Sequence, residues 1–262
     1  AGLYTLHIND RRVGMEYLTP YCNAYDAWMQ VITHDVTEYL HEGQNTLRFT
    51  LGSGWYKGRF SLMNQENIYG DRLAVIAELV LTHSDGSEER RGTDESWQIF
   101  SSAYIQNGIY DGVHIDSSLP QQHKAPRIFS ISKGLLHDRL SPPVTVQQEI
   151  KPVRAFHTPA GTFCLDFGQN LAGLIRVDTA QFPSVDFRLR FFETLAPDGS
   201  VYTKNLRTAK QELVYHSDGT ARTIVPEFTY YGFRYVWLDA DTELPPDAFT
   251  ALVLYSEMPE AG

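Results

Sequence analysis

The sequence predicts an all-β protein that consists of two consecutive antiparallel β-sandwich domains of the jelly-roll type. Many segments are rich in aromatic and β-branched residues, and each is bounded by Gly, Pro, Asn or Asp, which is the pattern of short strands joined by turns. Apolar residues nowhere recur with the helical period near 3.6 over a dozen positions. Strands this closely spaced, without helices between them, are typical of antiparallel sandwiches.

Local signals place the individual elements. The clearest strand patterns lie within residues 3–10, 45–52, 73–82, 186–195 and 233–238. The Asp-Gly pairs in HSDGS and APDGS predict two hairpins, because Asp-Gly supplies the positive φ that tight turns need.

One short helical turn is expected over residues 35–43. Asp35 or Thr37 can cap its start, and Gly43 can end it.

The stretch PEFTYYGFRYVWL, residues 226–238, has six aromatic side chains in thirteen positions. With the two-residue period of a strand, one face carries Tyr231, Phe233, Tyr235 and Trp237. The opposite face carries Phe228, Tyr230, Arg234, Val236 and Leu238. Both faces are largely apolar, so we expect a strand inside a sheet that is covered on both sides, or a strand with one face covered by another domain. A sugar-binding platform on this strand is the alternative. Gly232 is expected at a bulge or a close backbone approach, and Arg234 is expected to stack on a ring or pair with a carboxylate such as Glu193.

Composition limits the classes of function. The chain has 262 residues, of which 42% are hydrophobic and 21% charged, so it can bury a substantial core. Its formal net charge of -10 would repel phosphate backbones, and no nucleic-acid partner is expected. No apolar run reaches the roughly 20 residues of a membrane helix, and no membrane partner is expected. The chain starts with Ala-Gly rather than Met and lacks a signal-peptide pattern, so we expect a piece of a longer protein.

The sequence contains little evidence of a catalytic or metal-binding site. The motifs GxSxG, HExxH, GxGxxG and GxxxxGKS are absent. Cys22 and Cys164 are far apart and are expected to be buried free thiols. Asp166, Glu193 and Asp198 lie where a paired general acid and base can be imagined. We interpret them instead as turn and ion-pair residues, which is the usual role of acidic residues near strand ends.

The domain boundary is expected where the strand pattern slackens, at Pro142-Pro143. This pair resists both a helix and a central strand. The expected domains are residues 1–141 and residues 142–262.

Several motifs resemble bacterial α-L-rhamnosidases. The segments LHINDRRVG, DVTEYLHEGQN and GWYKGR resemble the N-terminal β domain of these enzymes, and LDFGQNLAG and PEFTYYGFRYVWL resemble the β domain that follows. The succession DVT, EGQN, GWYKGR, DFGQN and GFRYV covers nearly the whole chain in order. The resemblance implies a bacterial inverting glycoside hydrolase, periplasmic or extracellular, that degrades rhamnose-containing polysaccharides.

The same resemblance implies that the catalytic residues lie elsewhere. In the family an (α/α)6 barrel follows these domains and holds the carboxylates that hydrolyse terminal rhamnose, whereas this chain stops at Gly262. We therefore expect no catalytic residue here, and the barrel of the same polypeptide as a partner. The segment YDGVHIDSS also departs from the family pattern YDGExYDAR, with Val113, Ile115 and Ser117 at the acidic, aromatic and basic positions.

Sugar binding is the function that the loop GSGWYKGRFSLMNQENIYGD can carry. Some rhamnosidases have a calcium-dependent rhamnose-binding module in this region, so the resemblance implies a sugar site without locating it. The loop is long, and long loops on sandwiches commonly carry function. Trp55 and Tyr56 can present ring faces to a sugar, and Asn64, Asn67 and Asp71 can bind hydroxyls or Ca²⁺. The alternative is that Trp55 and Tyr56 plug the end of the sandwich.

Three classes of function remain open. The first is a non-catalytic fragment that supports the catalytic domain and recruits rhamnose-containing glycans. The second is a free-standing carbohydrate-binding or adhesion module, which a sugar titration tests. The third is an autonomous enzyme that uses Asp166 or Glu193, which turnover of an aryl rhamnoside tests.

Overall fold

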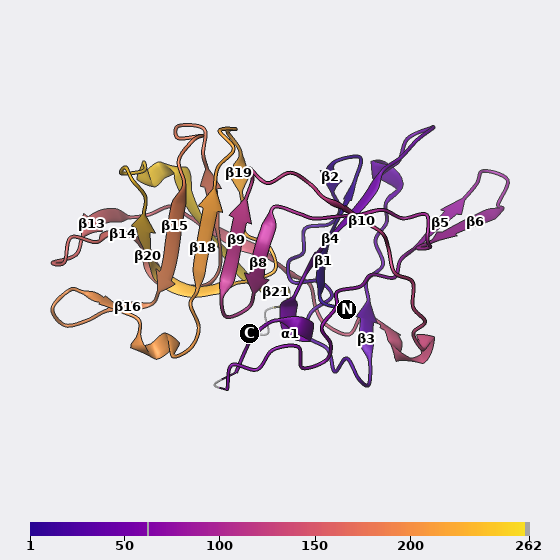
Figure 1. The fold of residues 1–262 in the computed structure, drawn as a ribbon, viewed down its shortest axis with the longest axis horizontal. Coiled ribbons are helices and arrows are strands. Elements are labelled where there is room, and N and C mark those ends of the chain that lie inside the picture. Colours follow the sequence, from indigo (N-terminus) through magenta and orange to yellow (C-terminus); the bar gives the residue numbers. More distant parts are fainter. Residues whose placement is uncertain (62, 260–262) are drawn as a thin grey trace.

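The computed structural model describes residues 1–61 and 63–259, and strands dominate it, as the sequence predicts (Figure 1). A ten-stranded sheet lies at one end of the molecule, and smaller sheets from the first half of the chain lie at the other. The protein is all-β, with β-sandwich domains in which most strand pairs are antiparallel. None of the described helices is long and apolar enough to span a membrane.

The N-terminal part is built from short sheets. Its central sheet has the order β2-β1-β4, comprising β1 (Leu3–Ile8), β2 (Arg11–Arg12) and β4 (Leu47–Gly52). The remaining pairs are β3 (Met29–Val31) with β11 (Leu136–Asp138), β5 (Glu78–Thr82) with β6 (Glu88–Gly92), and β7 (Ile99–Phe100) with β10 (His123–Lys124). The β3–β11 pair is parallel. Leu6, Ile8 and Val13 form the small core of this part.

The ten-stranded sheet holds the main core. Its order is β12-β21-β14-β20-β15-β18-β9-β8, and β13 and β19 also pair with β14. The strands are β8 (Tyr104–Gly108), β9 (Gly112–Asp116), β12 (Val144–Ile150), β13 (Arg154–His157), β14 (Phe163–Asp178), β15 (Phe187–Phe192), β18 (Glu212–His216), β19 (Thr223–Ile224), β20 (Tyr231–Asp239) and β21 (Phe249–Ser256). The short hairpin of β16 (Thr194–Leu195) and β17 (Val201–Tyr202) follows β15.

Strands β8 and β9 join the two halves of the chain. They come from residues 104–116, yet β9 pairs in parallel with β18 at the edge of the large sheet. Gly112 permits this approach, because its φ is +87° and an added Cβ would lie 1.9 Å from the carbonyl oxygen of Glu212. The first half of the sequence therefore supplies two strands, β8 and β9, at the edge of the ten-stranded sheet, which is the second sheet of the molecule.

The aromatic strand β20 lies inside the sheet, between β14 and β15, and both its faces are covered, as predicted. The assignment of residues to faces differs from the prediction. Tyr231 and Phe233 belong to the main core together with Val236 and Leu238, whereas Tyr235 belongs to a second cluster, against which Trp237 packs. The ladder between β14 and β20 shifts register between Asp166 and Leu171, and this irregularity breaks the simple two-residue period.

Most of the predicted turns are confirmed. The β5–β6 and β16–β17 hairpins turn at the two Asp-Gly pairs, with Gly86 and Gly199 at positive φ. The helical turn is the 3-10 helix η1 (Thr37–Tyr39), which is shorter than predicted and ends at Tyr39 rather than at Gly43. The Asp35 carboxylate accepts hydrogen bonds from the Thr37 amide and hydroxyl. The other short helices are α1 (Gly54–Lys57), η2 (Lys133–Leu135), η3 (Lys204–Leu206) and η4 (Pro246–Ala248).

The burial of Cys22 and the start of one strand also differ from the sequence predictions. Cys164 is buried, but Cys22 is exposed, because its neighbours Tyr21 and Asn23 point inward and leave the thiol on the outer side of the chain. The strand expected from residue 73 begins only at Glu78.

Candidate carbohydrate-binding loop

The described residues of the segment that follows β4, 53–61 and 63–71, form a loop that folds back on itself. It starts with α1 and contains an isolated bridge between Phe60 and Gln65. The amides of Asn67 and Tyr69 donate hydrogen bonds to the carbonyls of Lys57 and Tyr56, at 3.0 and 3.3 Å. The two sides of the loop are thus joined by backbone hydrogen bonds.

Trp55 lies at the junction of the two parts of the chain. Its side chain is half-buried against the buried residues Leu3, Ile109 and Phe228. The backbone is close to the same cluster, since a Cβ added to Gly52 would lie 2.2 Å from the Phe228 ring. These contacts support a packing role for Trp55 and leave only part of its ring accessible to a ligand.

Tyr56 packs within an aromatic group at the side of the loop. Its ring meets the buried Tyr25 edge to face, with the centroids 5.2 Å apart, and Tyr69 meets Tyr25 at 5.1 Å. Tyr69 is 39% exposed. Sequence reasoning did not single out Tyr69, although it lies in the same loop and offers an exposed ring.

The three polar candidates are exposed and have separate neighbours. Asn64 accepts a hydrogen bond from Arg59, Asn67 accepts one from Lys57 at 3.4 Å, and Asp71 lies 3.8 Å from the Arg72 guanidinium. Asn64 and Asn67 both have positive φ, at 52° and 56°, which Asn tolerates better than most residues. No hydrogen bond or ion pair joins the three side chains to one another in the described structure.

A metal ion needs converging oxygen or nitrogen ligands. Among the described residues, no three His, Cys, Asp or Glu side chains come together in a way that could hold one. Asp71 is the single carboxylate among the loop candidates, and its side chain is 76% exposed.

Arg59 fixes the loop to the second sheet, and the sequence alone did not reveal this role. Its guanidinium contacts both carboxylate oxygens of Asp111, with Nε 2.9 Å from Oδ2, and it donates to the carbonyl of Thr208 at 2.8 Å. Lys210 lies 3.7 Å from the same carboxylate. Burial alone would raise the pKa of Asp111, but the hydrogen bonds and charges of Arg59 and Lys210 lower it below its usual value. The loop is therefore held by a partly buried ion pair as well as by Trp55.

Comparison with known families decides the identity of this fold. Residues 1–155 match the α-L-rhamnosidase N-terminal domain, and residues 156–255 match the bacterial α-L-rhamnosidase concanavalin-like domain. The chain belongs to the α-L-rhamnosidase family.

Individual rhamnosidases resemble nearly the whole chain. An α-L-rhamnosidase of Streptomyces avermitilis is 32% identical over 90% of this chain, and one of Formosa agariphila is 28% identical over 100% of this chain. The crystal structure of the Aspergillus terreus α-L-rhamnosidase superposes with a TM-score of 0.91 at 35% identity over 98% of this chain. That of the Streptomyces avermitilis enzyme in complex with L-rhamnose gives 0.87 at 29% identity over the same share.

The chain spans only part of each of these rhamnosidases. It covers 24% and 30% of the two relatives in sequence, and 32% and 26% of the two crystal structures. The relatives therefore contain a large region that this chain does not include.

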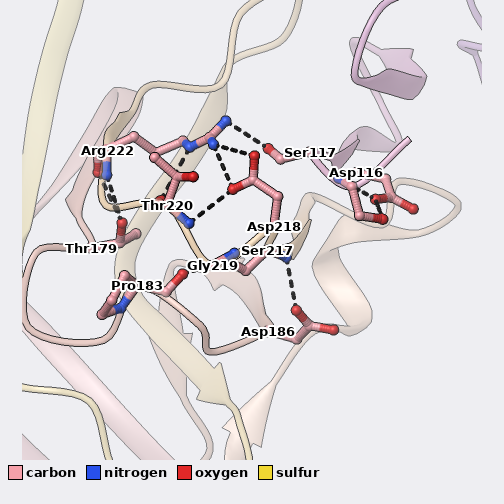
Figure 2. A network of polar contacts seen from close by, with 11 residues as sticks. Asp116, Ser117, Thr179, Pro183, Asp186, Ser217, Asp218, Gly219, Thr220 and Arg222 are labelled. Carbon is pink, nitrogen blue, oxygen red and sulfur yellow. Dashed lines mark hydrogen bonds and ion pairs between the residues drawn. The ribbon is translucent and has the colours of Figure 1, made fainter. Parts of the chain in front are cut away.

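The segment that departs from the rhamnosidase pattern has a structural role here. Val113 and Ile115 are buried in the main core. Figure 2 shows that the Ser117 hydroxyl meets the guanidinium of Arg222. The same guanidinium donates two hydrogen bonds of 2.6 Å to the Asp218 carboxylate. This network attaches the turn after β18 to the end of β9.

The acidic residues that a catalytic hypothesis would use have structural partners. Asp166 is buried and accepts hydrogen bonds from Arg234 at 2.8 and 3.1 Å and from the Gly168 amide at 2.8 Å. Arg234 therefore pairs with Asp166 on the neighbouring strand β14 and not with Glu193, which follows β15 on the other side of β20. Its guanidinium also lies 5.0 Å from the Tyr235 ring.

The other two acidic residues bond to nearby amides and hydroxyls. Glu193 accepts hydrogen bonds from the side-chain amides of Asn170 and Asn205, at 3.1 and 2.7 Å. Asp198 accepts from the amide and hydroxyl of Ser200 in the hairpin turn, at 3.0 and 2.6 Å.

Proposed function

We propose that this chain is the non-catalytic β-sandwich region of an α-L-rhamnosidase-like glycoside hydrolase, where it supports the catalytic barrel and recruits rhamnose-containing glycans. The observation that carries the proposal is the match of two successive rhamnosidase domains to residues 1–155 and 156–255, in a chain that covers about a quarter to a third of its relatives. The two domains are residues 1–141 and 142–262, linked through β8 and β9.

The electrostatics of Asp166 argue against a role as general acid. A general acid in a glycosidase needs a pKa raised towards neutral pH so that it carries a proton to the leaving group. Burial acts in that direction on Asp166, but the hydrogen bonds from Arg234 and from the Gly168 amide, with the charges of Arg234 and Arg154, lower its pKa below the usual value. Such a carboxylate stays ionised at neutral pH and stabilises the sheet.

The loop of residues 52–71 supports the recruitment of glycans. It exposes Asn64, Asn67 and Asp71, which offer donors and acceptors to sugar hydroxyls, beside the partly exposed ring of Tyr69. A monosaccharide has few atoms and gives up translational freedom on binding, so L-rhamnose should bind with a Kd of roughly 0.1 to 10 mM.

Two measurements test the proposal. At high concentration the chain should release no nitrophenol from an aryl α-L-rhamnoside above the buffer rate. A rate that Asp166→Asn or Glu193→Gln removes would show that the chain is an enzyme in its own right.

Sugar recruitment is tested by titrating L-rhamnose into the chain while recording chemical shifts, with Ca²⁺ and with a chelator. Asp71→Ala should weaken binding, whereas Asp138→Ala, a matched loss of an exposed carboxylate on β11, should not. Loss of binding in the chelator would indicate that binding depends on Ca²⁺, and Asp71→Ala then tests whether the loop holds the ion. Equal affinity in both variants and the wild type would exclude the loop as the site.

A further inference from the structure

A cavity of about 380 Å³ opens at the end of the second sheet, far along the sequence from the loop of residues 52–71. One wall is the hairpin that joins β13 to β14, residues 157–163. The other wall is the end of β20 and the segment that follows it, residues 237–243. The volume lies within the range of small-molecule sites, which begins at about 300 Å³.

Two aromatic side chains line the cavity, and one of them is firmly placed. Trp237 packs against the cluster of Cys164, Phe192 and Tyr235, and the Arg190 guanidinium lies over its ring at 4.1 Å from the centroid. Because these contacts hold the indole in place, the part of it that lines the cavity offers a preorganised apolar surface to a ligand.

The second aromatic residue, Phe163, lies in the same wall as His157, and the two rings are in contact. Their ring centroids lie 5.2 Å apart. His157 also lies 3.3 Å from the Glu243 carboxylate, so an ion pair connects the two walls when the imidazole is protonated. Residues from both walls thus meet at this side of the cavity.

Acceptor groups gather on the wall formed by residues 239–243. Asp239, Asp241 and Glu243 bring three carboxylates, and Thr242 adds a hydroxyl. Within the described part of the chain, no side chain forms an ion pair or hydrogen bond with the Asp241 carboxylate. Its acceptor capacity is therefore free for a ligand.

We propose that this cavity is a second binding site, for a neutral saccharide unit. A ring surface beside several carboxylate and hydroxyl groups matches a ligand with an apolar C–H face and many hydroxyl donors. The three carboxylates would repel uronic acids and phosphorylated sugars. The inference rests on the proposed function, because it takes the glycan class from it, but it concerns different residues from those of the loop.

The test is a titration of the 262-residue chain with methyl α-L-rhamnoside, followed by the chemical shifts of the tryptophan indole groups. The Trp237 resonance should shift with a saturable dependence. Asp241→Ala should weaken binding at this resonance at least fivefold, and Asp247→Ala, an equal charge change outside the cavity, should leave it unchanged. D-galacturonate should bind at least fivefold more weakly than the neutral glycoside.

Asp241→Ala changes an exposed residue, so a folding defect does not obscure the result. A Trp237 resonance that does not move up to 50 mM glycoside would overturn the proposal, and so would a D-galacturonate affinity equal to that of the glycoside. The loop site is read separately, from the Trp55 resonance and the effect of Asp71→Ala. Failure at one resonance with success at the other therefore separates this inference from recruitment by the loop.

Discussion

Replacing Trp55 by alanine distinguishes a packing residue from a sugar platform. Full truncation of a buried tryptophan costs about 3 to 5 kcal/mol. Trp55 is only half-buried, against Leu3, Ile109 and Phe228, so we expect a loss of about 2 kcal/mol in the free energy of unfolding. With an m value of about 3 kcal/mol/M for a chain of this size, the urea midpoint should fall by about 0.7 M.

The assay is equilibrium unfolding in urea, monitored by far-UV circular dichroism so that the lost indole does not affect the signal. Asp71→Ala is the control, since this exposed residue on the same loop should change stability by less than about 0.5 kcal/mol. Sugar titrations accompany both variants. A Trp55→Ala protein that is as stable as the wild type but has lost L-rhamnose binding would refute the packing argument and make the indole part of the site.

Three further predictions concern other parts of the molecule. Burial raises the pKa of Glu227 despite its pairing with Arg12, so the stability that this carboxyl contributes is complete below its unfolded pKa and is lost as the pH rises through the folded pKa. Glu227→Gln should therefore become more stable relative to wild type between pH 4 and pH 8, and a difference that does not change with pH would contradict this. Gly112→Ala should cost more than about 3 kcal/mol in thermal or urea unfolding, because the methyl group meets the backbone of Glu212, whereas Gly86→Ala, at φ +83° in open space, should cost only about 1 to 2 kcal/mol. Finally, the adjacent side chains of Ile128 and Phe129 are 61% and 63% exposed, and we expect an apolar patch that makes the native chain bind a hydrophobic dye or self-associate; a strictly monomeric, dye-silent protein would favour the free-standing module.

The strands and hairpins could be predicted because their causes are local. The Asp-Gly pairs set positive φ at the two hairpin turns, and alternating apolar residues mark β1 and β4. The faces of β20 could not be assigned in the same way. The switch between Phe233 and Tyr235 arises from the irregular pairing with β14 near Asp166, and this depends on a strand more than sixty residues earlier in the sequence.

Pairings between residues that are distant in sequence were the least predictable part of the structure. Arg234 has plausible carboxylate partners in several strands, and only the sheet order places Asp166 beside it. The junction of β9 with β18 is similar, because nothing local indicates that residues 112–116 leave their own half of the chain. The loop candidates were identified by residue type and loop length, which say what a side chain can bind but not what it already contacts.

The contacts of Trp55 and Arg59 restrict the motion of the loop. Trp55 contacts Leu3 on one side of the junction and Ile109 and Phe228 on the other, while Arg59 is joined to Asp111 beside β9. A loop attached to both parts of the chain has little freedom to move independently of the second sheet. A glycan bound to it would therefore be held in a fixed orientation relative to that sheet, which reduces the entropy lost when a neighbouring domain engages the same glycan. If the loop recruits a glycan as we propose, Trp55 and Arg59 would strengthen that recruitment by holding the loop in place.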